Sequence, residues 1–123
     1  GRAGVIVGIG TDIVEIGRVE KAYARAGFAQ RVYTEREREM IGGRAARAAG
    51  NFAVKEAVVK AFGTGFRGIS PLEIEVLRDK AGKPYAVLGG AALARSRELG
   101  IRKVHVTISN ERQYAVAFAA AED

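Results

Sequence analysis

The chain has 123 residues, of which 48% are hydrophobic and none is cysteine. This composition is typical of a globular protein and excludes disulfides, cysteine nucleophiles and cysteine-based metal sites. Lysine and arginine outnumber aspartate and glutamate by 20 to 14, and the net charge of +6 favours a polyanionic partner, whether a nucleic acid, an acidic protein or a nucleotide-like cofactor.

A chain of this length predicts a single domain over residues 1–123. No apolar run approaches the roughly 20 residues that a membrane-spanning helix needs. The apolar run near the N-terminus is short and leads directly into a patterned segment, unlike a signal peptide. We therefore expect a cytoplasmic protein without a membrane partner, and its modest core favours oligomerisation.

The N-terminal segments predict a strand followed by a helix. Residues 4–10 are apolar, rich in β-branched residues and bounded by glycines, which is typical of a buried strand. Residues 11–27 repeat apolar residues every three or four positions, and Asp12 with Glu15 predicts a capping box for a helix that ends at Gly27. The opposite face of this helix carries a mainly basic stripe: Arg18, Lys21, Ala22 and Arg25.

Two further helices are predicted before the middle of the chain. Thr34 and Glu37 indicate a second capping box, and Gly42-Gly43 is expected to end that helix. Residues 51–62 are apolar on nearly every side, which predicts a buried helix. Because charged residues are rarely buried without partners, three positions in this helix need an explanation: Lys55, Glu56 and Lys60.

The C-terminal half predicts an antiparallel sheet and one helix. Two pairs of segments alternate polar and apolar residues around a turn, and a short helix lies between the pairs. These elements are the strands 72–77 and 84–90 with a turn at 81–83, the helix 91–100, and the strands 103–110 and 113–120 with a turn at 110–112. The sum is an α+β fold, an antiparallel sheet packed with helices in one small domain.

Asp12, Glu56 and Lys60 are the residues whose positions suggest chemistry. Asp12, at the end of the predicted strand, is either a helix N-cap or a carboxylate that binds a hard cation. Glu56 and Lys60 lie four residues apart and share a helix face. They are either a stabilising surface pair or, because the helix is otherwise apolar, the lining of a cleft, metal or ligand site. The residues alone leave these alternatives open.

The glycine-rich segment 63–68 and His105 are further candidates that also have common structural explanations. Glycines after a helix are usually C-caps, and this segment lacks the Lys-Ser/Thr of a P-loop, although Lys60, Arg67 and the loop amides could attract phosphate. His105 lies on the polar face of an amphipathic strand, and a single histidine is not a metal site by itself.

Five segments together resemble the bacterial holo-acyl-carrier-protein synthases, which are the short 4′-phosphopantetheinyl transferases. They occur in the order and spacing of that family and cover nearly the whole chain: "VGIGTDIVEIGRVE", "FAQRVYTEREREMI", "NFAVKEAVVKAFGTGF", "LEIEVLRDKAGKPYAVLGG" and "VHVTISNERQYAVAFA". The first and third motifs are highly specific as a pair.

The resemblance implies a Mg²⁺-dependent enzyme of fatty acid biosynthesis. It would transfer the 4′-phosphopantetheine arm of coenzyme A to a serine of apo-acyl carrier protein and release 3′,5′-ADP. The resemblance also implies the family's α+β fold and a homotrimer with sites between subunits. By position, Asp12 and Glu56 match the family's Mg²⁺ ligands, and Lys60 matches a lysine near the reacting phosphates. Contacts with coenzyme A are implied for four residues: Gly63, Thr64, Gly65 and His105.

The residue types suit this chemistry. Attack of a hydroxyl on a diphosphate requires in-line positioning and charge neutralisation, and Mg²⁺ prefers hard oxygen ligands. We expect Lys60 to stabilise charge on the leaving phosphate and Glu56 to accept the serine proton, directly or through a water. Acyl carrier proteins of this kind are acidic, so a basic helix face is expected to dock the carrier, with a merely solvated face as the alternative: Arg18, Lys21 and Arg25.

The chain departs from the family pattern at Asn51, where many members have arginine, and at Asn110, where many have histidine. The first departure puts a contact with a coenzyme A phosphate in doubt, although Arg44 or Arg47 could replace it. Lys55 has no functional indication beyond its match to the family motif.

Two rival functions are a basic nucleic-acid-binding module and an inactive trimeric scaffold of the same fold. A nucleic-acid module would interleave aromatic and basic residues on one surface. The aromatic residues instead fall in apolar or helix-flanking positions: Phe28, Tyr33, Phe52 and Phe62. We therefore expect no nucleic-acid partner.

Overall fold

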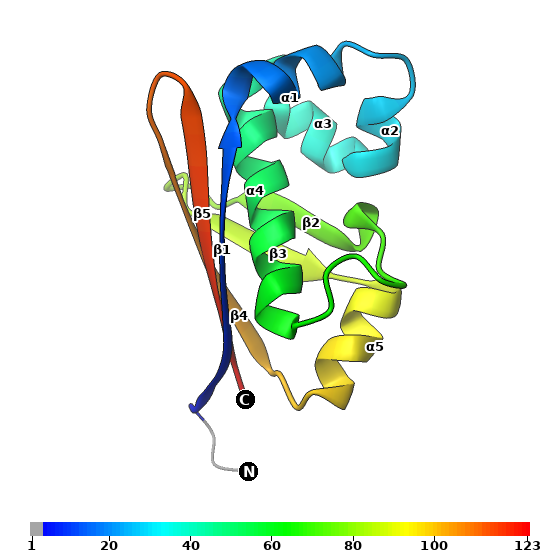
Figure 1. Ribbon diagram of the computed structural model, residues 1–123, viewed down its shortest axis with the longest axis vertical. Coiled ribbons are helices and arrows are strands. Elements are labelled where there is room, and N and C mark those ends of the chain that lie inside the picture. The colour runs from blue at the N-terminus through cyan, green and yellow to red at the C-terminus, as the bar shows by residue number, and fades with distance from the viewer. Residues whose placement is uncertain (1–3) are drawn as a thin grey trace.

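A three-stranded antiparallel sheet and the long helix α4 (Ala45–Phe62) form the centre of the structure, a computed structural model that describes residues 4–123 (Figure 1). The strands lie in the order β1 (Ile6–Glu15), β5 (Tyr114–Glu122) and β4 (Lys103–Asn110). The helix packs along the inner face of this sheet, where the side chains of β5 are all alanine from residue 115 to residue 121 at every second position. The fold is therefore the expected α+β class with antiparallel strands.

The remaining elements cover α4 on its other sides. A two-stranded antiparallel sheet and one short helix contribute to the same core, a 3₁₀ turn leads into that sheet, and three short helices surround the N-terminal half of α4 (Figure 1). These elements are β2 (Ile74–Arg78), β3 (Pro84–Leu88), η1 (Pro71–Glu73), α5 (Gly90–Glu98), α1 (Ile16–Tyr23), α2 (Phe28–Val32) and α3 (Glu35–Ile41). None of the helices in residues 4–123 is long and apolar enough to cross a membrane.

Several local predictions are confirmed. The Thr34 side chain accepts a hydrogen bond from the Glu37 backbone and Glu37 accepts one in return, which is the predicted capping box of α3. Gly42 ends that helix in the left-handed conformation. Polar and apolar residues alternate along β4 as predicted, and β4 and β5 pair in antiparallel register. The single domain over residues 1–123 stays a prediction, and residues 1–3 lie outside the described part.

The first predicted helix is wrong at both ends. Residues 11–15 continue β1, because they pair with β5, so Asp12 is a strand residue opposite Ala117 and not an N-cap. Glu15 precedes the helix but makes no side-chain capping bond. The helix ends at Tyr23, and Gly27 instead precedes α2 with a φ of 83°. Long-range strand pairing thus overrides the local helical periodicity.

Three smaller expectations are also corrected. Ala22 is buried although it lies on the same helix side as Arg18, four residues earlier, so the predicted basic stripe is not exposed along its whole length. The buried helix begins at Ala45 rather than at residue 51. Leu72 lies in η1 and not in the following strand, because Ser70 and Glu73 form a capping box around Pro71 that starts a 3₁₀ turn.

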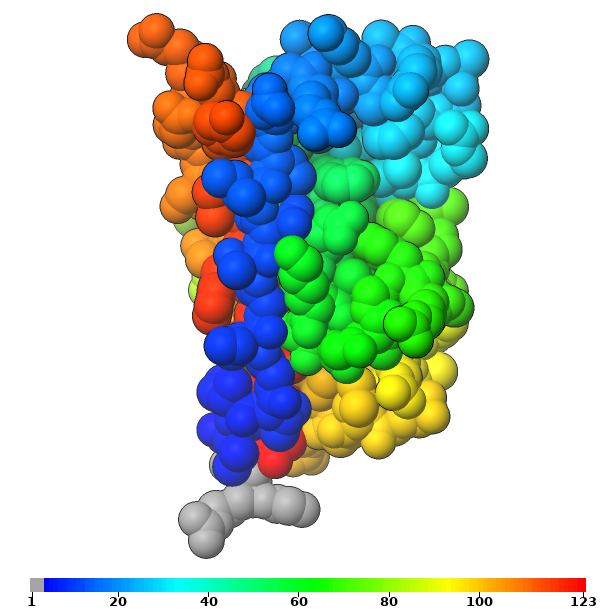
Figure 2. Space-filling view, viewed as in Figure 1, coloured from blue at the N-terminus to red at the C-terminus, as the bar shows by residue number. Residues whose placement is uncertain are grey.

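The outer face of the three-stranded sheet is uncovered, and its strands β1 and β5 expose large apolar side chains there. Ile9 and Ile13 of β1 are each 63% exposed, and Phe118 of β5 is 42% exposed. Register pairing places these side chains on the face opposite α4. Figure 2 shows β1 (blue) crossing the surface beside the green segment that contains the end of α4. We call the exposed side of β1, β5 and β4 the outer sheet face.

Candidate active site

Two glycines of β1 let the strand approach α4 closely. A Cβ atom at Gly8 would overlap the carbonyl oxygen of Ala61, and a Cβ at Gly10 would overlap that of Ala57. Any larger residue would therefore push the strand away from the helix. This close approach brings Asp12, two residues after Gly10, against the same helix.

Asp12 and Lys60 form the polar contact between the strand and the helix. The ammonium nitrogen of Lys60 lies 3.2 Å from Asp12 Oδ1 and donates a hydrogen bond of 3.0 Å to the carbonyl oxygen of Thr11. The Asp12 side chain is 15% exposed and the Lys60 side chain is 52% exposed, so the contact lies at the rim of the core where a ligand can reach it.

Glu56 lies one helical turn before Lys60 and belongs to the same charge cluster. Burial raises the pKa of the Glu56 carboxyl above its ordinary value of 4.5, and the nearby Asp12 charge raises it further. Lys60 acts in the opposite direction. Two carboxylates and one ammonium group therefore converge at one place, and the carboxylates repel each other there. The choice between a surface pair and a ligand site for Glu56 and Lys60 stays a prediction.

The carboxylates fit a divalent cation. Asp12 Oδ2 is buried and has no hydrogen-bond partner, so one oxygen of the carboxylate is available for a ligand. Within the described residues, no group of three or more His, Cys, Asp or Glu side chains is placed to hold a metal. The chain thus offers two hard oxygen donors, Asp12 and Glu56, and other ligands would come from phosphate and water, as is common for Mg²⁺.

The loop after α4 is a helix C-cap. Gly63 has a φ of 76°, and the backbone N–H groups of Gly63, Thr64 and Gly65 donate to the carbonyl oxygens of Lys60 or Val59. These amides are therefore already hydrogen-bonded to carbonyl oxygens in the last turn of α4. Gly63 and Gly65 have open space where a side chain would be, so their contact with coenzyme A stays a prediction that would use this space.

His105 lies on the outer sheet face, whereas Asp12 lies on the inner face. His105 pairs with Ala120 of β5 and its Nε2 lies 3.3 Å from Glu122 Oε2. Its side chain is 54% exposed. Within one chain, the structure therefore does not bring His105 together with the cluster of Asp12, Glu56 and Lys60.

A groove is lined by the end of β1, by α1 and by the start of β5, together with single residues of α2 and α4. It has a volume of about 460 Å³, and its lining includes two predicted docking residues, Arg18 and Arg25, and two aromatic residues, Phe28 and Phe52. The third predicted docking residue, Lys21, is exposed on α1 but does not line the groove. The groove lining also includes Ile13, which follows Asp12 in β1, but none of Asp12, Glu56 and Lys60.

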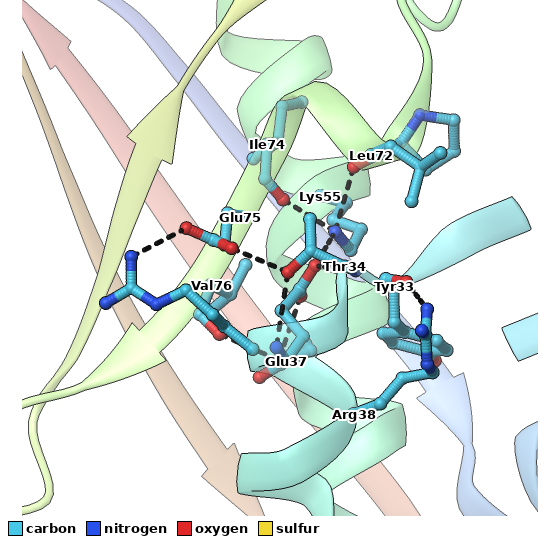
Figure 3. Close-up of polar contacts among 12 residues, drawn as sticks. Tyr33, Thr34, Glu37, Arg38, Lys55, Leu72, Ile74, Glu75 and Val76 are labelled. Carbon is cyan, nitrogen blue, oxygen red and sulfur yellow. Dashed lines mark hydrogen bonds and ion pairs between the residues drawn. The ribbon is translucent and has the colours of Figure 1, made fainter. Parts of the chain in front are cut away.

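The sequence interpretation missed a buried polar network on another side of α4. Lys55 and Glu37 form an ion pair of 2.8 Å in which both side chains are buried (Figure 3). Asn51, the departure from the family pattern, is fully buried and donates to Glu37 Oε2 and to the carbonyl oxygen of Val76. Arg78 donates to the side-chain oxygen of Asn51. The sequence signal for this network is the spacing of Asn51 and Lys55, two polar positions one turn apart on an otherwise apolar helix.

Comparison with known proteins gives a consistent result. The model of the 4′-phosphopantetheinyl transferase superfamily matches residues 8–119. A holo-[acyl-carrier-protein] synthase from Lachnoclostridium phytofermentans is 50% identical over 118 residues, which cover 96% of this chain and 97% of that protein. The solved structure of an acyl carrier protein synthase from Plasmodium yoelii with ADP bound has a TM-score of 0.88 and 32% identity, and covers 98% of each chain.

A further solved structure agrees with these two. A holo-(acyl-carrier-protein) synthase from Bacillus anthracis in complex with CoA (3′,5′-ADP) has a TM-score of 0.80 and 38% identity, covering 96% of this chain and 97% of that one. Sequence, fold and motif spacing thus agree over nearly the full length. This chain therefore belongs to the 4′-phosphopantetheinyl transferase superfamily.

Proposed function

We propose that this chain is a holo-[acyl-carrier-protein] synthase that transfers the 4′-phosphopantetheine group of coenzyme A to a serine of apo-acyl carrier protein and releases 3′,5′-ADP. Relatives that carry this name, and one solved in complex with CoA (3′,5′-ADP), support the activity and coenzyme A as substrate. The observation that carries the proposal is the cluster of Asp12, Glu56 and Lys60, with its unpartnered carboxylate oxygen.

The residues of the cluster have separate roles in the proposed reaction. Asp12 and Glu56 would hold Mg²⁺, which supplies charge neutralisation for the diphosphate when it is bound. The serine oxygen attacks the phosphorus attached to the pantetheine arm, and the bond to the other phosphate breaks with its electron pair. Lys60 stabilises the negative charge on that leaving phosphate. Glu56, directly or through a water, accepts the serine proton, and burial together with the Asp12 charge raises its pKa above the ordinary value.

The groove beside α1 is the proposed docking site for an acidic acyl carrier protein. Arg18 and Arg25 line it and Lys21 extends the positive charge along the exposed face of α1. Phe28 and Phe52 give the groove an apolar part that could receive a side chain of the carrier. Charged rims of this kind mainly increase the association rate.

A homotrimer is part of the proposal. The outer sheet face exposes several large apolar residues, and faces of this kind are usually covered by another chain. His105 lies on that face, so it would reach an active site only in a neighbouring copy. Contact of His105 with coenzyme A therefore requires assembly. A cytoplasmic role in fatty acid biosynthesis belongs to the same proposal.

One experiment tests the activity directly. The protein is mixed with coenzyme A, Mg²⁺ and an apo-acyl carrier protein, and the carrier is followed by mass spectrometry. We expect the carrier to gain the mass of one phosphopantetheine, and an Asp12→Asn variant to lose this activity. If intact carrier gains no mass while the protein binds nucleic acid tightly, the nucleic-acid alternative replaces this proposal.

A further inference from the structure

Lys55 directly precedes Glu56 in α4, but its side chain extends from a different side of the helix. Successive helical residues are turned by about 100°, so the two side chains diverge. Glu56 lies with Asp12 next to β1, whereas Lys55 is surrounded by α3, η1 and the start of β2 (Figure 3). The direction of one side chain therefore determines the direction of the other.

The Lys55 ammonium group is fully engaged. It donates to Glu37 Oε1 at 2.8 Å, to the carbonyl oxygen of Pro71 at 2.8 Å and to that of Ile74 at 2.6 Å. An ammonium group has three donors, so none is left for a substrate. The side chain is 1% exposed, which also excludes contact with a ligand. Lys55 is thus not a catalytic residue.

The partners of Lys55 connect α4 to two other parts of the chain. Glu37 is fixed in α3 by its capping box with Thr34 and also accepts from Asn51, one turn before Lys55. Pro71 and Ile74 lie just beyond the loop that leaves α4 at Gly63. Lys55 therefore ties the far end of this loop back to the helix from which the loop starts.

The helix needs such directional contacts. The Gly8 and Gly10 contacts fix the side of α4 that faces β1. On its other sides, the buried residues are mostly alanine or valine, which pack with few directional constraints. Hydrogen bonds and ion pairs have defined directions, and a buried pair often contributes more to specificity than to stability. Burial lowers the pKa of Lys55, and the Glu37 carboxylate opposes that effect.

We propose that Lys55, held by Glu37, is a positioning residue that sets the rotation of α4 and so aims Glu56 at Asp12, while also holding the end of the loop at residues 63–70. This inference rests on the proposed transferase function. It assigns the third unexplained charge of the helix a role that acts through Glu56 and the loop rather than on the substrate.

The test replaces the pair by an uncharged one. The double variant Lys55→Met/Glu37→Gln leaves no unpaired buried charge, and Arg36→Met removes an exposed cation from the same cluster as a matched control. Hydrogen exchange without ligand is measured first. We expect amides in residues 64–74 to exchange about tenfold faster in the double variant, with no change in the amides of α1 and none in the control.

Titrations of activity with coenzyme A and with Mg²⁺ test whether the Glu56 side chain is still directed at Asp12. In the double variant, we expect the Mg²⁺ concentration for half-maximal activity to rise about tenfold and the KM for coenzyme A to rise, while the KM for acyl carrier protein stays unchanged. If the double variant merely contained less folded protein, kcat would fall while the Mg²⁺ half-saturation and both KM values stayed unchanged. Calorimetric titration of coenzyme A in the presence of Mg²⁺ gives the same comparison without turnover.

The outcomes are distinct. A folded double variant with wild-type hydrogen exchange and wild-type Mg²⁺ half-saturation would overturn the inference. If the double variant does not fold, Glu37→Gln alone, which keeps the shape of the side chain, must raise the Mg²⁺ half-saturation or the inference is wrong. Failure of the wild-type protein to modify the carrier would instead contradict the proposed function, and the exchange and calorimetric comparisons would still decide the role of Lys55.

Discussion

Gly10 of β1 lies directly against the carbonyl oxygen of Ala57 in α4, so that even a methyl group at residue 10 would overlap this oxygen. We predict that Gly10→Ala separates the strand from the helix and moves Asp12 away from Glu56. Overpacking of this kind costs about 1–3 kcal/mol in unfolding free energy, and the transferase activity should be lost. Urea unfolding and the carrier mass assay measure both effects.

Gly17→Ala is the matched control for this change, because a Cβ at Gly17 in α1 has no neighbour within 4 Å. Its stability should be equal to or slightly above that of the wild type, with normal activity. Wild-type stability and activity in Gly10→Ala would mean that the strand and helix are not in close contact.

Lys60→Met should lower kcat by about 100-fold, because it removes a positioned positive charge from the reacting phosphates. The ion pair with Asp12 is half-exposed on the lysine side, so the unfolding free energy should change by less than about 1 kcal/mol. Steady-state kinetics and thermal unfolding separate the two effects. Lys80→Met, at an exposed turn, serves as the control. A Lys60→Met enzyme with unchanged kcat would remove Lys60 from the mechanism.

Glu56→Gln should remove activity but stabilise the metal-free protein at neutral pH. Burial and Asp12 raise the pKa of Glu56 above 4.5, so the folded state binds this proton more tightly than the unfolded state does. Stability is therefore lost as the pH rises from 4.5 through the folded pKa, so Glu56 makes the protein less stable at neutral pH than glutamine would.

Thermal unfolding in a chelator at neutral and at acid pH checks this prediction. The advantage of Glu56→Gln should be present near pH 7 and should shrink below pH 4.5, where Glu56 is protonated in both states. Mg²⁺ should stabilise the wild type but not the variant. A variant that is less stable than the wild type at neutral pH, or one that keeps full transferase activity, contradicts the assignment.

Reversal of the basic face of α1 should weaken carrier docking. The triple variant Arg18→Glu/Lys21→Glu/Arg25→Glu is expected to raise the KM for acyl carrier protein about 100-fold at low salt, with an unchanged KM for coenzyme A. A triple reversal elsewhere, at the exposed residues Lys80, Arg97 and Arg102, controls for net charge. Equal effects of both variants, or none, would place the dock elsewhere.

Phe118→Lys should disrupt the proposed trimer, because it places a charge in the middle of the outer sheet face. Light scattering should show dissociation, and activity should fall with it. Tyr85→Lys on β3 is the control, since Tyr85 is also 42% exposed but lies on the other sheet. If Phe118→Lys remains assembled and active, another face forms the oligomer.

Features that depend on neighbours in the chain were predictable from the sequence, and features that depend on distant pairing were not. The Thr34–Glu37 capping box needs only a three-residue spacing, and it is present. The helix expected at Asp12 is strand, because its pairing partner Ala117 lies in the last element of the chain. The partner of Lys55 is Glu37 in another helix, which no periodicity indicates.

The candidate site was likewise predictable where it depends on residue types and motifs, and not where it depends on contacts between distant segments. The residue types and the family motifs indicated Asp12, Glu56 and Lys60, and the structure brings these three together. The sequence pattern indicates Gly4 and Gly10 only as bounds of the predicted strand and gives Gly8 no role, although Gly8 and Gly10 set the distance between strand and helix. Their role depends on the surface of α4, which is not visible in the strand's own sequence.

The inward face of β5 consists of alanine alone, and it packs against α4. The same helix leaves room only for glycine at residues 8 and 10 of β1. In a library of random variants selected for carrier modification, these positions should tolerate almost no substitution, although none of them carries a functional group. The positions least tolerant of substitution would then lie at the contact between α4 and the sheet rather than among the residues that bind metal or substrate. In this enzyme, mutational sensitivity would report how closely the backbone segments approach one another, and chemical roles would need separate evidence from kinetics.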